Sequence, residues 1–147
     1  MNNIFIKELK EEEIKKALAL VWEVFLQYEA PDYSQEGIDE FYKSIHDYNY
    51  LKNLRIFGAY VNDVLAGVIA TRSESTHIAL FFVDRKYHRQ GIGRHLFQTV
   101  IQHNSSGKIT VNSSPYAVPV YHKLGFRDTS AEQIVNGLRF TSMEWRP

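Results

Sequence analysis

The feature that most constrains this chain is the segment FFVDRKYHRQGIGRH at residues 81–95. Its apolar start predicts the end of a buried strand, and the periodic apolar residues after Gly91 predict a helix. The chain must therefore turn from strand to helix across Gly91 and Gly93. Glycine lets an anion approach the backbone without meeting a Cβ, and the first N–H groups of a helix attract negative charge. The segment predicts a phosphate-binding turn, with Arg89 and Arg94 available for additional charged contacts.

Two common nucleotide-binding motifs do not fit this turn. The dinucleotide-binding motif needs a third glycine where this chain has Leu96, and an acidic ribose partner on a following strand, which is missing. The Walker A loop needs Gly-Lys-Ser/Thr after its glycines, and that sequence is also missing. A lone Gly-x-Gly before a helix is often a plain turn. The glycines alone therefore leave two interpretations open, a phosphate site and a simple turn.

Length and composition exclude several classes of protein. The 147 residues predict a single domain spanning residues 1–147. Seventeen basic residues balance seventeen acidic ones, so neither nucleic acid nor an anionic membrane is an expected partner. The absence of cysteine excludes disulfides, thiolate metal sites and a cysteine nucleophile. The six histidines form no clear ligand set, so no metal is expected, and the charged N-terminal segment favours a cytoplasmic protein.

The hydrophobic pattern predicts a mixed α/β domain with one central sheet, in the order β-α-α-β-β-β-α-β-α-β-β. Apolar residues at three- and four-residue steps mark the helices, and Tyr48 is expected on the apolar side of the second one. Asn62-Asp63 and Asn136-Gly137 predict tight turns between strands. The expected strands lie at 4–6, 55–61, 64–71, 77–83 and 108–111, with two more within 126–145, and the expected helices lie at 11–25, 38–48, 91–101 and 118–123.

Two motifs at their observed spacing resemble the GNAT superfamily of acetyl-CoA-dependent N-acetyltransferases. The first is Phe81-Phe82-Val83 followed by the turn HRQGIG, residues 88–93, and the second is YHKLGF at residues 121–126. The resemblance covers roughly residues 55–128, and it implies a mostly antiparallel central sheet flanked by helices. One departure is His88, which stands where the family has Gln or Arg.

The resemblance implies acetyl-CoA as co-substrate. In the family the strand end offers backbone groups to the pantetheine arm and the thioester oxygen, while the turn holds phosphate. The family often has an Asn before the short helix, which corresponds to Ser114 here, with Asn112 two residues earlier. The residues expected to bind the co-substrate are Phe81, Phe82, Val83, His88, Arg89, Gln90, Gly91, Ile92, Gly93, Arg94, Asn112 and Ser114.

Two residues are expected to be catalytic. A Tyr121 phenol stays protonated at neutral pH and can give a proton to a departing thiolate, although a tyrosine on a helical stripe is also a normal core residue. An amine acceptor must lose a proton before it attacks, and the break after the first helix supplies Glu29 among other acidic residues. We expect Glu29 to be the base, while an ordinary solvated loop is the alternative for this region.

These expectations define two hypotheses for function. The first is an N-acetyltransferase that moves an acetyl group from acetyl-CoA to a primary amine of a small molecule or peptide by direct attack in a ternary complex. The second is a noncatalytic CoA-binding or regulatory module that retains the fold. Tyr121 favours the first, because a binding module needs no proton donor. Dimerisation through the C-terminal strands stays open.

Overall fold

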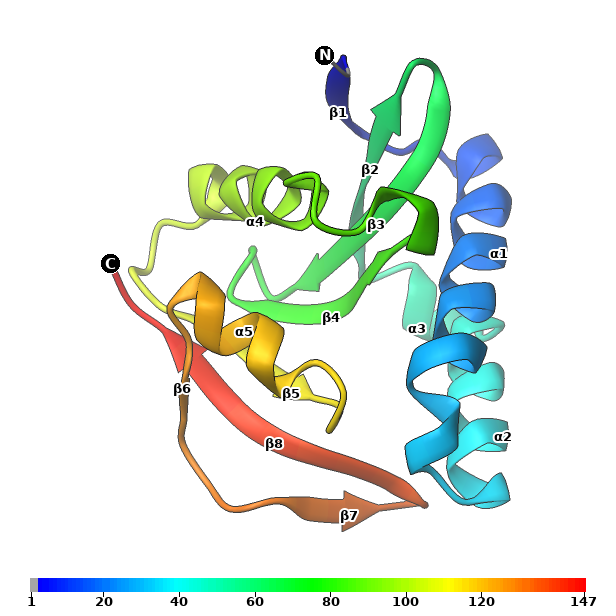
Figure 1. Ribbon diagram of the computed structural model, residues 1–147, viewed down its shortest axis with the longest axis vertical. Coiled ribbons are helices and arrows are strands. Elements are labelled where there is room, and N and C mark those ends of the chain that lie inside the picture. The colour runs from blue at the N-terminus through cyan, green and yellow to red at the C-terminus, as the bar shows by residue number, and fades with distance from the viewer. Residues whose placement is uncertain (1–2) are drawn as a thin grey trace.

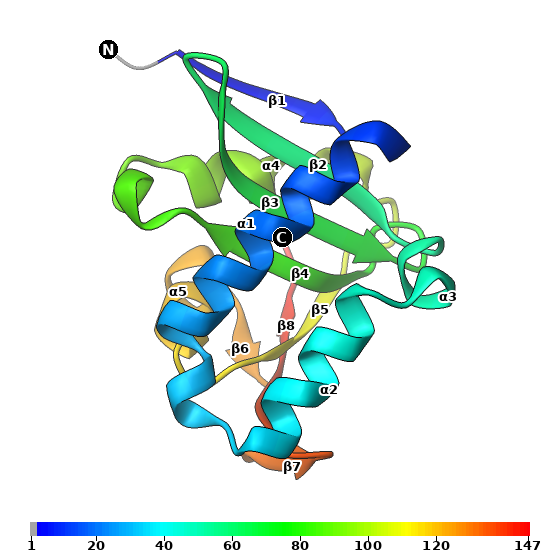
Figure 2. The same ribbon diagram turned by 90° about the vertical axis from the view of Figure 1, so that its right-hand side faces the viewer.

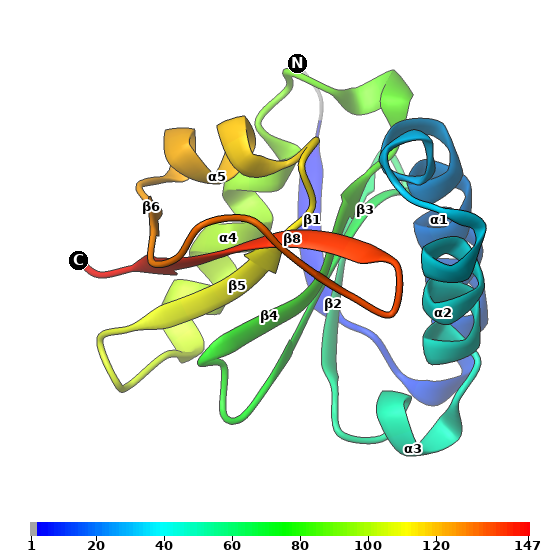
Figure 3. The same ribbon diagram turned by 90° about the horizontal axis from the view of Figure 1, so that it is seen from below.

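The computed structural model describes residues 3–147 and shows one open sheet between two layers of helices (Figures 1 and 3). The helices are α1 (Glu11–Tyr28), α2 (Gln35–Ile45), α3 (Tyr48–Leu51), α4 (Ile92–His103) and α5 (Val118–Leu124). The strands are β1 (Ile4–Glu8), β2 (Arg55–Val61), β3 (Val64–Arg72), β4 (His77–Val83), β5 (Ile109–Ser113), β6 (Arg127–Asp128), β7 (Gln133–Val135) and β8 (Leu138–Trp145).

The sheet has the strand order β1-β2-β3-β4-β5-β8-β6, and β7 pairs with β8. The paired strands are antiparallel, except that β4 and β5 are parallel. The predicted fold class, a mostly antiparallel central sheet flanked by helices, is therefore confirmed.

Each face of the sheet carries its own apolar core. On one face α1 and α2 lie side by side across the strands (Figure 2), and Val21 and Phe25 of α1 are fully buried there. On the other face α4 and α5 pack against the sheet, with Leu96 and Val100 of α4 fully buried (Figure 3). These residues recur at helical steps, so the burial of one apolar stripe explains why both segments are helical.

Both predicted tight turns are present. Asn62 and Asp63 join β2 to β3 with φ of 50° and 67°, and Asn136 and Gly137 join β7 to β8 with φ of 53° and 80°. Two successive left-handed residues match the twist of a hairpin, and Asn, Asp and Gly adopt this conformation most readily.

Two details differ from the sequence prediction. Tyr48 was expected on the second helix, but α2 ends at Ile45 and Tyr48 begins α3 with 73% of its surface exposed. The cause is Asp47, whose carboxylate accepts a hydrogen bond from the Asn49 amide and caps a new helix (2.8 Å). The tail forms three strands in place of two, because β6 and β7 pair with separate parts of β8.

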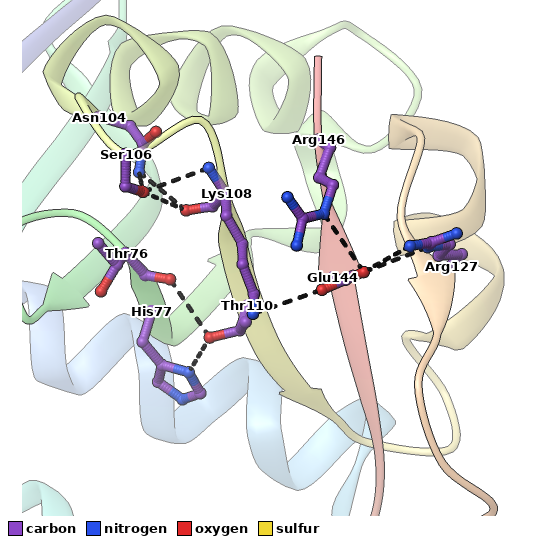
Figure 4. Close-up of polar contacts among 9 residues, drawn as sticks. All are labelled: Thr76, His77, Asn104, Ser106, Lys108, Thr110, Arg127, Glu144 and Arg146. Carbon is purple, nitrogen blue, oxygen red and sulfur yellow. Dashed lines mark hydrogen bonds and ion pairs between the residues drawn. The ribbon is translucent and has the colours of Figure 1, made fainter.

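A buried carboxylate ties together β5, β6 and the C-terminal end of β8. Glu144 is 8% exposed and lies 2.7 Å from Arg127, 3.5 Å from Arg146 and 3.6 Å from Lys108 (Figure 4). The hydrogen bond from Arg127 holds the pKa of Glu144 below its usual value. The cluster holds β5 and β8 together at one end, and both strands contribute walls to the site described below.

Candidate active site

The site begins where β4 and β5 separate. β4 and β5 pair with each other at His77–Thr110 and Ile78–Val111. Within the described residues the two strands form no further pair with each other beyond these. His77 Nδ1 donates to Thr110 Oγ1 (2.8 Å), and that hydroxyl donates to the Thr76 carbonyl (3.2 Å; Figure 4). Burial, and secondarily the charge of Arg72, lowers the pKa of His77 to about 4. The ring is therefore neutral at pH 7. Beyond these hydrogen bonds β4 and β5 diverge, and we name the gap between the two strands the wedge.

The wedge leaves main-chain groups of β4 open. The amide of Asp84 donates to the Ala66 carbonyl of the neighbouring strand (2.8 Å). Because successive residues of a strand point these groups in alternate directions, Phe82 also faces β3, while Phe81 and Val83 face the wedge. The Val83 carbonyl accepts a hydrogen bond from His88 Nε2 (2.8 Å). The amides of Phe81 and Val83 and the Phe81 carbonyl thus point into the wedge, where no strand of the described chain pairs with them.

The glycine turn follows the same strand. Gly91 has φ +82° and is the N-cap of α4, so the first amides of the helix point out of the turn. Gly93 lies close to the wedge, because a Cβ added there would be 3.4 Å from the Phe81 ring. The side chains of Arg89 and Arg94 are exposed beside these amides. Unpaired amides, a helix N-terminus and two cations are groups that could hold the phosphates of a ligand.

A cavity of about 430 Å³, which we name the turn cavity, connects the glycine turn to the wedge. Three rings of its lining, from α1, the turn and the loop before α5, lie close together. Tyr28 is 5.2 Å from His88 and 4.9 Å from Tyr116 between ring centroids. The predicted residues that line it are Glu29, Phe81, Phe82, Val83, His88, Arg89, Gly91, Ile92, Gly93, Arg94 and Tyr121.

A second cavity of about 310 Å³, which we name the inner cavity, lies between the wedge and the helix pair α1–α2. It is walled by residues of α1, α2, β4, β5 and β8. Five residues line both cavities: Glu29, Phe81, Phe82, Ala117 and Tyr121. The two cavities therefore meet at one carboxylic acid and one phenol.

Tyr121 is held rigidly at this junction. It lies in α5, is 5% exposed, and makes edge contacts with Phe81 (5.9 Å) and Phe126 (5.1 Å). Burial raises the pKa of the Tyr121 phenol, and the nearby Glu29 carboxylate raises it further. The phenol therefore stays protonated at neutral pH, which is the form that a proton donor needs, and a core position is compatible with that form.

Glu29 is the C-cap of α1 and lies half-buried at the same junction. Burial raises the pKa of Glu29 to about 8, a hydrogen bond with Ser114 opposes this shift, and the charge of Asp32 adds to it. A carboxyl group with a pKa in this range exchanges a proton readily near neutral pH, which is the property of a general base.

Three predicted ligands lie elsewhere than in the turn cavity. Asn112 and Ser114 line the inner cavity. Gln90 lines neither cavity, and its side-chain amide donates to the Lys86 carbonyl (3.1 Å). Sequence reasoning missed the inner-cavity residues Glu40 and Arg139, because neither belongs to a local motif.

The described part of the chain shows neither a cluster of metal ligands nor a membrane-spanning helix. Within residues 3–147 no group of three or more His, Cys, Asp or Glu side chains could hold a metal ion. None of the helices in the same range has the length and apolar character needed to cross a membrane.

The family follows from a comparison with family models. The model of the acetyltransferase (GNAT) domain matches residues 29–147, which is most of the chain. The chain belongs to the GNAT acetyltransferase family. No curated protein sequence matches it.

Solved structures share the fold at low sequence identity. A GCN5-related N-acetyltransferase from Rhodopseudomonas palustris superposes with a TM-score of 0.85 at 20% identity, covering 100% of this chain and 98% of that one. PaiA N-acetyltransferase from Thermoplasma acidophilum, solved with coenzyme A, gives 0.75 at 18% identity and 99% of both chains. FeeM, an N-acyl amino acid synthase from uncultured soil microbes, gives 0.73 at 14% identity, covering 99% and 92%.

Proposed function

We propose that this protein transfers an acetyl group from acetyl-CoA to the primary amine of a small molecule or peptide, by direct attack within a ternary complex. The observation that carries the proposal is the meeting of two cavities at Tyr121 and Glu29. A donor in one cavity and an acceptor in the other would bring thioester and amine together at a proton donor and a proton acceptor.

The turn cavity fits acetyl-CoA. The amides at the start of α4, with Arg89 and Arg94, would hold the phosphates, and Gly91 and Gly93 leave the backbone accessible. The open main-chain groups of Phe81 and Val83 would pair with the amides of the pantetheine arm. The coenzyme A complex of the Thermoplasma relative supports this assignment, since that protein has the same fold.

Acetyl-CoA supplies the thioester, whose C–S bond breaks as the amine nitrogen bonds to the acetyl carbon, with the electron pair leaving on sulfur. Glu29, when ionised, takes one proton from the bound ammonium and frees the nitrogen lone pair. Tyr121 gives its proton to the departing sulfur, and the second proton lost by the nitrogen balances that donation. An ammonium and acetyl-CoA thus yield an amide, the CoA thiol and one proton.

The composition of the chain supports direct transfer. A covalent acetyl-enzyme of the thioester kind needs a cysteine, and the sequence has none. In the proposed route the amine attacks the thioester of acetyl-CoA itself, which requires both substrates to be bound at once.

Initial rates with both substrates varied test this proposal. CoA release is measured over a panel of polyamines, aminoglycosides, amino acids and peptides, and the best acceptor is then used for the two-substrate matrix. We expect intersecting double-reciprocal lines. Parallel lines would contradict direct transfer, and CoA binding without release from any acceptor would favour the noncatalytic module.

A further inference from the structure

The inner cavity has an unbalanced charge. Three charged side chains line it: Glu29, Glu40 and Arg139. The Arg139 guanidinium is already engaged, because Nε and Nη2 donate to both oxygens of Glu132 (3.0 and 3.2 Å) and Nη1 donates to the Asp32 carbonyl (3.3 Å). The positive charge of Arg139 is therefore largely balanced by Glu132. Because burial raises the pKa of Glu29 to about 8, Glu29 is mostly neutral at pH 7, and Glu40 is the remaining acidic side chain of the lining.

Glu40 is the carboxylate that belongs to the inner cavity alone, since Glu29 also lines the turn cavity. It is half-buried on α2, and its backbone carbonyl accepts a hydrogen bond from Ser44 Oγ (3.0 Å). Among residues 3–147 no salt bridge to the Glu40 side chain is found. A half-buried carboxylate that faces a cavity without a cationic partner favours a cationic ligand.

The remaining walls suit the methylene chain of a ligand. Phe25 and Phe41 stack on each other at 4.0 Å between centroids, and Tyr33 lies 5.7 Å from Phe25, so one wall of the cavity is an aromatic cluster. Burial raises the pKa of Tyr33 and of Tyr50, so both phenols stay neutral.

The two carboxyl groups are attached to different helices. The Phe25–Phe41 stack sets residue 25 of α1 level with residue 41 of α2. Glu29 lies about 6 Å further along α1, one turn on, and packed helices are about 8–10 Å apart. The attachment points of Glu29 and Glu40 are therefore roughly 10 Å apart. This is the reach of a short flexible chain with an amine at each end.

We infer that Glu40 makes the inner cavity selective for diamines, in which one amine reacts at Glu29 and the second, as a cation, binds Glu40. This assignment rests on the proposed acetyltransfer and adds the class of acceptor to it. Glu40 is a specificity-determining residue here, because it contacts the distant end of the acceptor and not the reacting atoms.

The test compares two acceptors of equal length, butane-1,4-diamine and 4-aminobutan-1-ol, along with their longer homologues. The second replaces the distant ammonium with a neutral hydroxyl group. We expect the wild-type protein to favour the diamine in kcat/KM by about ten- to hundredfold, as for a charged hydrogen bond in a partly buried site. Glu40→Gln should remove that preference through KM and leave the rate with the amino alcohol nearly unchanged.

Asp39→Asn is the matched control, since it removes one charge from the same helix at an exposed position outside both cavities. It should retain the preference for the diamine. Equal activity of the wild-type protein on both acceptors, or an equal loss on both in Glu40→Gln, would overturn the selectivity and leave acetyltransfer standing. No CoA release with any amine in the series would overturn the proposed function itself, and this inference with it.

Discussion

The turn cavity and the inner cavity are adjacent, but they are built in different ways. The turn cavity is built mainly from one continuous stretch, from the end of β4 through the glycine turn into α4, where backbone groups are accessible, and residues of α1 and α5 join it. The inner cavity depends on side chains from helices and strands far apart in sequence, such as Glu40 on α2 and Arg139 on β8. A backbone-built site suits one constant donor, whereas a side-chain-built site can change its ligand by substitution. We therefore expect substitutions to change the specificity for donor and for acceptor separately.

The largest expected effect comes from the junction that both cavities share. Tyr121→Phe should lower kcat by about 10³, because it removes the proton donor to the departing sulfur, and leave the Kd for CoA unchanged. Turnover is measured by CoA release and affinity by calorimetry. Tyr116→Phe is the control, since its ring lines only the turn cavity and is 41% exposed. Unaltered turnover in Tyr121→Phe would remove Tyr121 from the mechanism.

The second effect concerns the base. The pKa of Glu29 is raised to about 8 by burial, so the carboxylate form needed for proton transfer increases as pH rises through about 8. We expect kcat/KM to rise with pH across that range. In Glu29→Gln this rise should be absent, and the rate at pH 8 should fall by about 10². The same rise of kcat/KM with pH and the same rate in Glu29→Gln would assign the base elsewhere.

A paired substitution tests whether the two cavities are separable. A Cβ at Gly37 would lie 2.2 Å from the Gly137 carbonyl oxygen, so Gly37→Ala must push α2 away from the β7–β8 hairpin, both of which wall the inner cavity. Gly91→Ala meets no atom closer than 3.6 Å but carries φ +82°, which strains the turn.

The expected results of this pair are opposite. Gly37→Ala should raise KM for the amine about tenfold and leave KM for acetyl-CoA unchanged, and Gly91→Ala should do the reverse, since about 1–2 kcal/mol of strain corresponds to such a factor. Steady-state kinetics with each substrate varied measures both values. Equal changes in both KM values for either variant would show that the cavities act as one unit.

The smallest effect is on stability. The folded-state pKa of Glu29, about 8, lies above its ordinary value of 4.5, so the folded protein binds more protons than the unfolded chain between these values. Stability therefore falls as pH rises from about 4.5 to 8. Glu29→Gln should not show this loss. After allowance for partial exposure, its free energy of unfolding should exceed that of the wild type by on the order of 1–2 kcal/mol at pH 8 and should equal it at pH 4.5. Urea unfolding at the two pH values measures it, and equal differences at both would contradict the raised pKa.

The turn cavity could be predicted from sequence because its information is local. The apolar strand end, Gly91 and Gly93 lie within thirteen residues, and each acts through backbone geometry that residue type largely determines. The hairpin turns at Asn62-Asp63 and Asn136-Gly137 were predictable for the same reason. The start of α3 was missed because Asp47 was not recognised as a cap.

The inner cavity could not be predicted in the same way. Glu40 carries no motif, and it acquires its position because the Asn136-Gly137 turn packs on Gly37 one hundred residues earlier in the chain. Asn112 and Ser114 were assigned by family position, while their place in the lining of the inner cavity depends on where β4 and β5 diverge. Such placements follow from tertiary packing, which a periodic pattern does not encode.

The structure of this protein with CoA bound is the most direct test of the central claim that donor and acceptor meet at Tyr121 and Glu29. We expect the pantetheine arm to lie in the wedge, with its sulfur about 3–4 Å from the Tyr121 hydroxyl and facing the inner cavity. A pantetheine arm outside the wedge, or a sulfur beyond the reach of Tyr121 and turned away from the inner cavity, would contradict it.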